Sequence, residues 1–137
     1  MKFFIDTSIF IDVLRSKPIE SSKSLFKSLR NINDGITSVI TVAELCVGAY
    51  RSSSKDALNK TLILLSNVHI ADLNRDHAIE GGRLYAELIK KGEAIELNDC
   101  LIAATSMSFD IWEIVTRDNH FNRIKGIKTV TPEELGF

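Results

Sequence analysis

The stretch Phe3-Phe4-Ile5-Asp6-Thr7-Ser8 opens the chain with a short apolar run that ends on an acid and two hydroxyl residues. Residues 2–5 are predicted to form a buried strand, because a brief and uniformly apolar run is typical of a strand covered on both faces. Apolar residues at helical spacing follow directly, so a helix is expected over residues 9–15. The chain therefore begins with a strand that leads through an acid into a helix.

The same alternation of strands and helices continues along the chain. Further strands are predicted over residues 36–39, 68–73, 111–116 and 127–130. Helices are predicted over residues 21–30, 41–50, 57–65, 76–91 and 98–107. This order favours the α/β class, as a three-layer sandwich with a central, mostly parallel sheet flanked by helices.

Length and composition indicate a single domain over residues 1–137, since 137 residues with 45% hydrophobic content can bury a core. Lys and Arg number 17 and Asp and Glu 18, and this net charge of −1 does not indicate a general polyanion binder. Asp6 interrupts a possible signal sequence, and no apolar run approaches ~18 residues, so a cytoplasmic protein without a membrane span is expected. Cys46 and Cys100 lack metal-site spacing and are expected to be buried thiols.

The sequence also predicts how some apolar residues and glycines pack. Ile79, Leu84, Leu88 and Ile89 are expected on the apolar side of the longest helix, with Gly92 as its C-cap. Gly81-Gly82 inside that helix costs about 1 kcal/mol per glycine relative to Ala, so close helix packing is expected there, either inside the domain or at a dimer contact. Phe109, Ile111 and Trp112 are most simply core residues.

Acids stand at or near the predicted strand ends. Asp6 follows the first strand, Glu44 lies in the helix after the second, and Asp118 closely follows the strand that ends near Thr116. Asp99 opens a helix whose start could reach the same edge. Ligands of open α/β sheets bind at the carboxyl ends of the strands, so these acids are candidates for one site.

Each acid also has a purely structural explanation. Asp6 could cap the following helix, Thr41 and Glu44 fit a capping box, Asp99 would favour a helix dipole, and Asp118 could be a turn residue. Capping gives no reason for the acids to converge. If they do converge, two charges about 5 Å apart at an effective dielectric of ~20 repel by about 3 kcal/mol, so the group needs protons or a counter-ion. Carboxylates without His or Cys suit Mg²⁺ or Mn²⁺, whose usual chemistry at phosphates is the attack of water on a phosphodiester.

Four segments now resemble the motifs of PIN-domain nucleases in the right order over nearly the whole chain. They are residues 4–8 (FIDTS), 38–45 (SVITVAEL), 98–104 (NDCLIAA) and 115–121 (VTRDNHF). The compact length is similar to that of VapC-type toxins from toxin–antitoxin pairs.

The resemblance implies the PIN-like fold and a divalent-metal-dependent ribonuclease. Asp6, Glu44, Asp99 and Asp118 match the acidic metal-binding and catalytic positions. Thr7, Ser8 and Thr116 match supporting polar positions beside two of these acids. Glu96 departs from the pattern as a fifth acid, which leaves its role open. An antitoxin that covers the N-terminal helices and the metal site is also implied, as is a homodimer.

Basic residues around the fourth motif are candidates for contacts to RNA. Arg117, His120 and Arg123 flank the proposed ligand Asp118, and a solvated surface is the competing interpretation. The alternative function is a non-catalytic PIN-like module that binds RNA or protein, which would be indicated by missing acids. A phospho-acceptor receiver domain would instead need a second acid beside Asp6 and a late-strand Lys, and the chain has neither at those places.

Overall fold

The computed structural model describes residues 1–137 and contains one sheet of five parallel strands. The strands are β1 (Phe3–Ile5), β2 (Gly35–Ser38), β3 (His69–Ala71), β4 (Glu113–Val115) and β5 (Lys128–Val130). Their spatial order is β3-β2-β1-β4-β5, and in the central strand Phe4 pairs with Ile36 on one side and Ile114 on the other. Because all strands are parallel, their carboxyl ends lie at one edge of the sheet.

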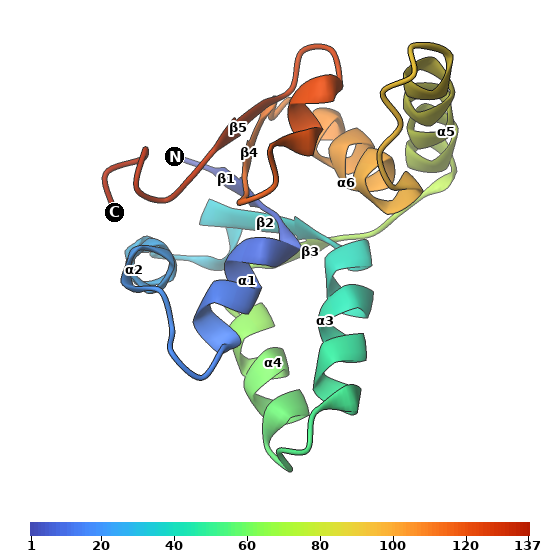
Figure 1. Cartoon of the computed structure of the whole chain (residues 1–137). Helices are drawn as coiled ribbons and strands as arrows, with labels where there is room; N and C mark the ends of the chain where they lie inside the picture. Colours follow the sequence, from blue (N-terminus) through green and yellow to red (C-terminus); the bar gives the residue numbers. More distant parts are fainter.

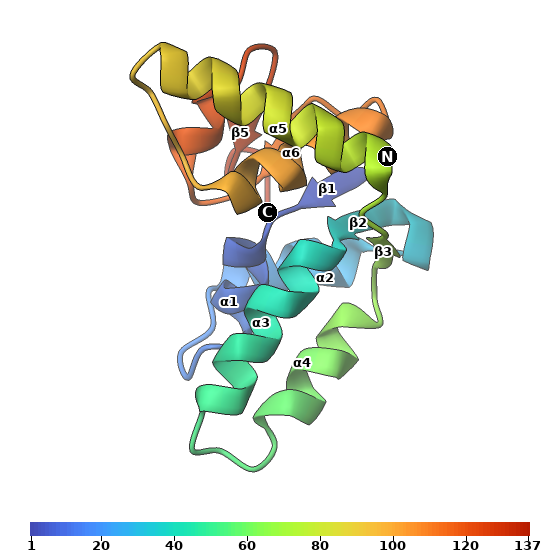
Figure 2. The same cartoon turned by 90° about the vertical axis from the view of Figure 1, so that its right-hand side faces the viewer.

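Helices cover both faces of this sheet. They are α1 (Thr7–Leu14), α2 (Glu20–Ser28), α3 (Val39–Arg51), α4 (Ala57–Leu65), α5 (Arg75–Lys90) and α6 (Leu97–Ser108), with 3₁₀ helices η1 (Ile32–Asp34) and η2 (Asn119–Arg123). Figures 1 and 2 show α1 to α4 on one side of the sheet and α5 and α6 on the other. The predicted α/β sandwich with a parallel sheet is confirmed.

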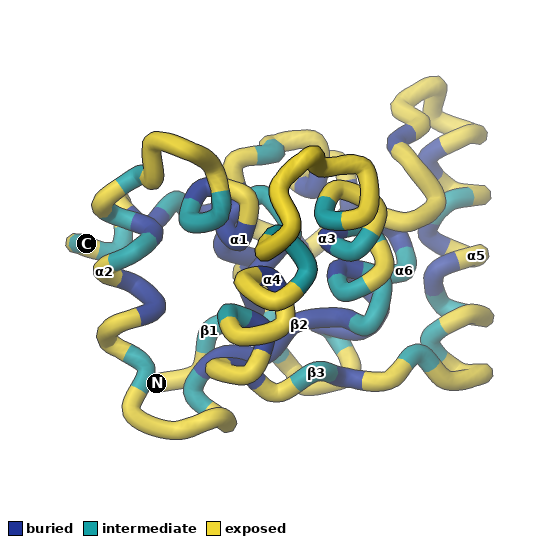
Figure 3. The backbone as a smooth tube through the Cα atoms, turned by 90° about the horizontal axis from the view of Figure 1, so that it is seen from below, coloured by how far each residue is buried: buried dark blue, intermediate teal, exposed yellow.

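The sheet divides the core into two clusters, as the alternation of side chains along a strand requires. Phe4 and Ile114 face the cluster that α5 and α6 complete, whereas their neighbours Ile5 and Val115 face the cluster under α1 to α4. The tube in Figure 3 is buried along β1 and β2 and exposed at the outer turns of the helices. Both faces of the central strands are therefore covered, which explains why their sequences are continuously apolar.

Every strand and α-helix lies where the sequence predicts one, with shifted boundaries, whereas the 3₁₀ helices η1 and η2 were not predicted. The helix predicted over residues 57–65 coincides with α4. Helix α1 begins two residues earlier than expected, because the Asp6 carboxylate accepts a hydrogen bond from the Ser8 amide. The strands predicted over residues 68–73 and 111–116 shorten to three residues each.

Helix α5 presents a narrower apolar side than expected. Leu84 and Leu88 are buried, as predicted, but Ile79 and Ile89 are more than half exposed, so their assignment to the apolar side was wrong. The helix packs mainly on α6, and the buried positions Gly81, Leu84 and Leu88 follow helical spacing along that single contact. One helical neighbour covers only one stripe of α5.

The two glycines of α5 differ in their surroundings. A Cβ atom built on Gly81 would lie 2.6 Å from Leu101 Cδ2, so close packing of α5 on α6 is confirmed at this position. A Cβ on Gly82 would meet nothing within 4 Å, so no close packing inside the domain involves this glycine. Gly92 has φ +68° directly after the C-cap of α5, which confirms its predicted position.

The aromatic residues before β4 are more exposed than expected. Trp112 is 43% exposed and Phe109 is 39% exposed, and only Ile111 packs partly against the core. The Trp112 indole donates a hydrogen bond to the Asp110 carboxylate, 2.9 Å away, at the amino-terminal edge of the sheet. The core assignment was therefore wrong for Trp112 and Phe109, because the helices do not extend over that edge.

The two cysteines of the chain are free thiols. Cys100 is buried, and this burial raises the pKa of its thiol to about 11, whereas Cys46 is only half-buried. Neither forms a disulfide. None of the helices combines the length and the apolar character that a membrane span requires.

Candidate active site

Asp6 is placed at the carboxyl end of the central strand. Its backbone N–H donates to the Val115 carbonyl, 2.9 Å away, which continues the ladder between β1 and β4 by one residue. Its carboxylate accepts hydrogen bonds from the hydroxyls of Thr116, at 2.7 Å, and Ser8, at 3.0 Å. Burial raises the pKa of this carboxyl, and the hydrogen bonds from Thr116 and Ser8 oppose that rise. Asp6 thus caps α1, as the structural explanation required, and also lies with the other acids.

Glu44 lies in the second turn of α3 and turns toward α1. The Thr7 hydroxyl donates to Glu44 Oε1 at 2.7 Å, and because that proton is used, the Thr41 hydroxyl donates to Thr7 Oγ1 at 2.9 Å. The predicted capping box of Thr41 and Glu44 is wrong. Helix α3 starts at Val39, where the Ser38 hydroxyl accepts a hydrogen bond from the backbone and caps the helix. Thr41 is instead buried in the helix and supports Thr7.

The pKa of Asp99 depends on the charges around it. It lies in the first turn of α6, and its pKa is raised to about 7, first by burial and then by the charges of Asp6, Asp118, Glu44 and Glu96. The acids on α3, on α6 and after β1 and β4 therefore lie near enough to one another for their charges to disfavour the ionised form of Asp99. We call Asp6, Glu44, Asp99 and Asp118 the acidic pocket.

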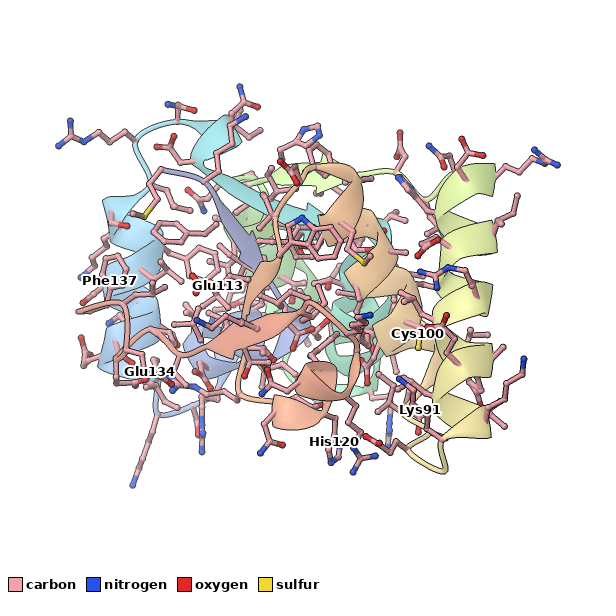
Figure 4. All side chains as sticks on the ribbon, turned by 90° about the horizontal axis from the view of Figure 1, so that it is seen from above. Lys91, Cys100, Glu113, His120, Glu134 and Phe137 are labelled. Atoms are coloured by element: carbon pink, nitrogen blue, oxygen red, sulfur yellow. The ribbon has the colours of Figure 1, made fainter.

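Asp118 is tied to Asp6 through a shared hydroxyl. Its backbone N–H donates to Thr116 Oγ1 at 2.9 Å, and the same hydroxyl donates to Asp6. Its carboxylate caps η2 by accepting from the His120 amide at 2.9 Å, and it lies 3.3 Å from His120 Nδ1. Figure 4 shows His120 projecting from η2 at the rim of the molecule. Thr116 therefore fixes the relative placement of two acids.

The acidic pocket contains no internal cation. No Lys or Arg forms an ion pair with any of its four carboxylates, and the only basic group in contact is His120. Clustered carboxylates without a cation favour the binding of an external one. The structure thus retains the unbalanced charge that the sequence predicted for converging acids.

The donor set suits a hard dication. All four groups are carboxylates, and oxygen ligands are those that Mg²⁺ and Mn²⁺ prefer. As the side chains are placed, no three His, Cys, Asp or Glu residues stand close enough together to ligate one ion. Mg²⁺ commonly uses only one or two carboxylates and completes its shell with water and substrate oxygens, so one ion does not need three of these acids at once.

The basic residues of the last motif have separate surroundings. Arg117 turns away from the pocket and pairs with Asp12 and Glu133. Arg123 is exposed and donates to the Ala94 carbonyl at 3.1 Å. His120 thus lies beside Asp118, Arg123 lies farther along η2, and the guanidinium of Arg117 uses its hydrogen bonds within the protein.

Three supporting residues escaped prediction from the sequence. Thr41 had been interpreted as a cap, and Asp12 and Ser22, both buried, had been assigned no role. A signal existed for Asp12, because it is the one charged residue inside the apolar helix α1. Its partner Arg117 lies 105 residues away, which no local pattern can reveal.

A groove runs from the acidic pocket between α1, α3 and α4. Its volume is about 480 Å³. Glu44 lines it together with Ile11, Leu14 and Leu45, and Arg15 and Lys60 add positive charge. The groove therefore combines an apolar floor with groups of both signs and includes one carboxylate of the acidic pocket.

Known proteins resemble this chain over nearly its whole length. Residues 3–127 match the PIN domain family. The chain is 34% identical to "Ribonuclease VapC2" of Haemophilus influenzae over 94% of this chain and 96% of that protein. Among solved structures, VapBC2 from Rickettsia felis bound to a promoter DNA fragment has a TM-score of 0.81 at 28% identity, covering 96% of this chain and 98% of that one. DNA-bound VapBC from Salmonella typhimurium has a TM-score of 0.78 at 30% identity, covering the same shares.

Proposed function

The chain belongs to the PIN-domain family, and on that premise we propose that it is a divalent-metal-dependent endoribonuclease that hydrolyses RNA phosphodiester bonds. The proposal is supported by the acidic pocket, in which the Thr116 hydroxyl contacts both Asp6 and the Asp118 amide, Thr7 holds Glu44, and the charges of these acids help to raise the pKa of Asp99. No Lys or Arg pairs with any of the four carboxylates. All four acids of the family pattern are present, so the non-catalytic alternative is not favoured. We take residues 1–137 as one catalytic domain.

In this proposal Asp6, Asp99 and Asp118 would hold one or two Mg²⁺ or Mn²⁺ ions between them, with Glu44 acting directly or through water. When bound, the ion supplies acidity to a water nucleophile and neutralises charge on the phosphate. The chain's own hydroxyls do the positioning. Thr116 holds the Asp6 carboxylate at 2.7 Å, and Thr7 holds that of Glu44 at 2.7 Å, so both acids keep fixed directions.

Substrate binding would use the rim of the pocket. His120 and Arg123 are exposed on η2 beside Asp118, and we propose that they contact RNA phosphates. Arg117 is left out of this role, because its guanidinium already pairs with two carboxylates. Few basic groups take part, so the affinity for RNA should depend only weakly on salt concentration.

The test of this function is metal-dependent RNA cleavage. Wild-type protein with Mg²⁺ or Mn²⁺ should cleave RNA, EDTA should abolish cleavage, and Asp6→Asn should lower the rate by about 100-fold or more, since loss of several kcal/mol of transition-state stabilisation has that effect. Glu113→Gln is the matched control, because this exposed acid starts β4 at the amino-terminal edge of the sheet, opposite the edge that carries the acidic pocket. Cleavage that persists in EDTA would refute the proposal.

We propose further that the chain is the toxin of a toxin–antitoxin pair and that a cognate antitoxin occupies the groove. VapBC complexes, such as that of Salmonella typhimurium, have this fold. An amphipathic segment could place apolar residues on Leu14 and Leu45 and a basic residue at Glu44. It would then block the acidic pocket. A partner that protects Cys46 or the α2 surface instead of the groove in hydrogen exchange would contradict this placement.

We also propose that the protein is cytoplasmic and forms a homodimer. The cytoplasm contains RNA and keeps thiols such as Cys46 reduced. Val47, Tyr50, Leu62 and Ile63 are 49–74% exposed outside the groove, and a homodimer contact would cover such apolar surface. Light scattering of the purified chain measures the oligomeric state directly.

A further inference from the structure

Arg117 joins four parts of the fold through its side chain. Its Nε donates to Asp12 Oδ2 at 2.8 Å, and its two terminal nitrogens donate to Glu133 at 2.6 and 3.0 Å. One of these nitrogens also lies 3.2 Å from Ser22 Oγ and 3.3 Å from Ser21 Oγ. The Ser22 hydroxyl in turn donates to Asp12 at 2.6 Å. We call these five residues the Arg117 cluster.

The cluster is anchored in the interior on one side and in the C-terminal segment on the other. Asp12 of α1 is 5% exposed and Ser22 of α2 is fully buried. Glu133 belongs to the segment after β5, which runs beside α2 in Figures 1 and 4. A bidentate Arg–carboxylate pair has a fixed geometry, so Arg117 cannot move far without breaking several bonds at once.

The backbone of Arg117 is tied to the acidic pocket. Its N–H donates to Ser8 Oγ at 2.9 Å, and the same Ser8 hydroxyl donates to Asp6. The residues on either side of Arg117 are Thr116, which donates to Asp6, and Asp118 itself. The side chain of Arg117 thus anchors the segment 116–118. That segment also carries Asp118 and the Thr116 hydroxyl that holds Asp6.

We propose that Arg117 is a positioning residue for the acidic pocket, acting through Asp12 and Glu133 rather than on RNA. This inference rests on the proposed function. Without the guanidinium, Asp12 would be a buried carboxylate with no cation, and residues 116–118 would lose the anchor on their outer side. Displacements of about 1 Å at reacting groups can cost about 100-fold in rate. Removal of groups that orient metal ligands typically weakens metal affinity 10–100-fold.

The experiment measures Mn²⁺ affinity by calorimetry on the intact protein and, separately, kcat and KM for RNA cleavage. Arg117→Ala should weaken Mn²⁺ binding by about 10-fold or more and lower kcat, with KM little changed. Arg117→Lys should fall between wild type and Arg117→Ala, because an ammonium group can pair with one carboxylate but cannot span both. Arg30→Ala is the matched control, since this exposed side chain has no hydrogen bond in the structure, and it should leave all three quantities unchanged.

Other outcomes overturn the inference in distinct ways. Unchanged Mn²⁺ affinity and kcat with a raised KM and a weaker salt dependence would make Arg117 an RNA contact. Unchanged values with only a lower melting temperature would make it purely structural. If Arg117→Ala fails to fold, Glu133→Gln keeps the buried pair and should still weaken Mn²⁺ binding by about threefold, and no change would overturn the inference. Wild-type protein that binds no Mn²⁺ would refute the proposed function itself.

Discussion

Arg117 and Asp118 are neighbours in the sequence but belong to two different groups of carboxylates. The carboxylates of one group pair with an arginine, whereas those of the other pair with no Lys or Arg. In the Arg117 cluster, Asp12 and Glu133 meet a guanidinium at 2.8 and 2.6 Å, which balances part of their charge within the protein. In the acidic pocket no Lys or Arg pairs with the acids, and the pKa of Asp99 rises to about 7. The chain contains enough basic residues to balance the pocket, but it does not place them there.

This difference separates structural acids from functional ones. A carboxylate with an internal cation stabilises the fold, and its removal leaves a charge without a partner. A carboxylate among like charges destabilises the fold, and an external cation relieves that cost. The sign of the stability change on neutralising an acid therefore indicates to which group it belongs.

The largest expected effect is that of Asp99→Asn. RNA cleavage should fall about 100-fold or more. In EDTA at pH 8 the same variant should be more stable than wild type by about 1 kcal/mol, a value reduced for solvent screening of this half-buried group. Cleavage assays and thermal unfolding in EDTA measure the two effects. A variant that loses both activity and stability would show that Asp99 is a structural acid.

The next largest expected effect is that of Asp12→Asn, which should lower stability where Asp99→Asn raises it. This change keeps the shape of the side chain but leaves Arg117 with Glu133 alone, so the free energy of unfolding should fall by about 2 kcal/mol. Urea unfolding measures it. Glu20→Gln is the control, because it removes an exposed pair with Lys23 and should change stability by less than about 0.5 kcal/mol. Equal effects of the two variants would remove the distinction between balanced and unbalanced acids.

The acidic pocket was largely predictable from the sequence. Asp6 and Asp118 come after β1 and β4, Asp99 lies in the first turn of α6, and Glu44 lies on the helix after β2. The parallel topology gathers the carboxyl ends of β1, β2 and β4 at one edge. The boundaries and caps were less predictable. The pattern of Thr41 and Glu44 satisfies a capping box, but Ser38 at the end of β2 already caps α3, and this depends on where the strand stops.

The Arg117 cluster could not be predicted, for a physical reason. Its members lie on α1, on α2, after β4 and after β5, and ion pairs between such distant residues follow no spacing rule. Arg117 beside a proposed metal ligand therefore looked like an RNA contact. The exposure of Trp112 and Phe109 could not be predicted either. The apolar character of a residue does not show which edge of a sheet the helices leave uncovered.

A smaller effect comes from the packing of α6, which carries Asp99 of the acidic pocket but no member of the Arg117 cluster. Gly81→Ala would place a methyl group 2.6 Å from Leu101 Cδ2 and 3.3 Å from Leu101 Cα, so stability should fall by about 1–2 kcal/mol and Mn²⁺ binding should weaken. Gly82→Ala, one residue along and in open space, should instead stabilise α5 by about 0.5–1 kcal/mol. Thermal unfolding of both variants measures these changes. If Gly81→Ala and Gly82→Ala changed stability in the same direction, the packing described for α5 and α6 would be contradicted.

The smallest effect is the dependence of stability on pH that Glu133 of the Arg117 cluster contributes. The hydrogen bond from Arg117, with a second from Ser21, lowers the pKa of Glu133 from 4.5 to about 2. A lowered pKa means that the stabilisation is present above pH 4.5 and is lost as the pH falls from there toward 2. Because Glu133 is exposed, solvent screening limits the loss to under about 1 kcal/mol. Unfolding of wild type and Glu133→Gln between pH 5 and pH 3 measures it. The two curves should converge as the pH falls, whereas curves that stay parallel would mean that the pair contributes nothing through its charge.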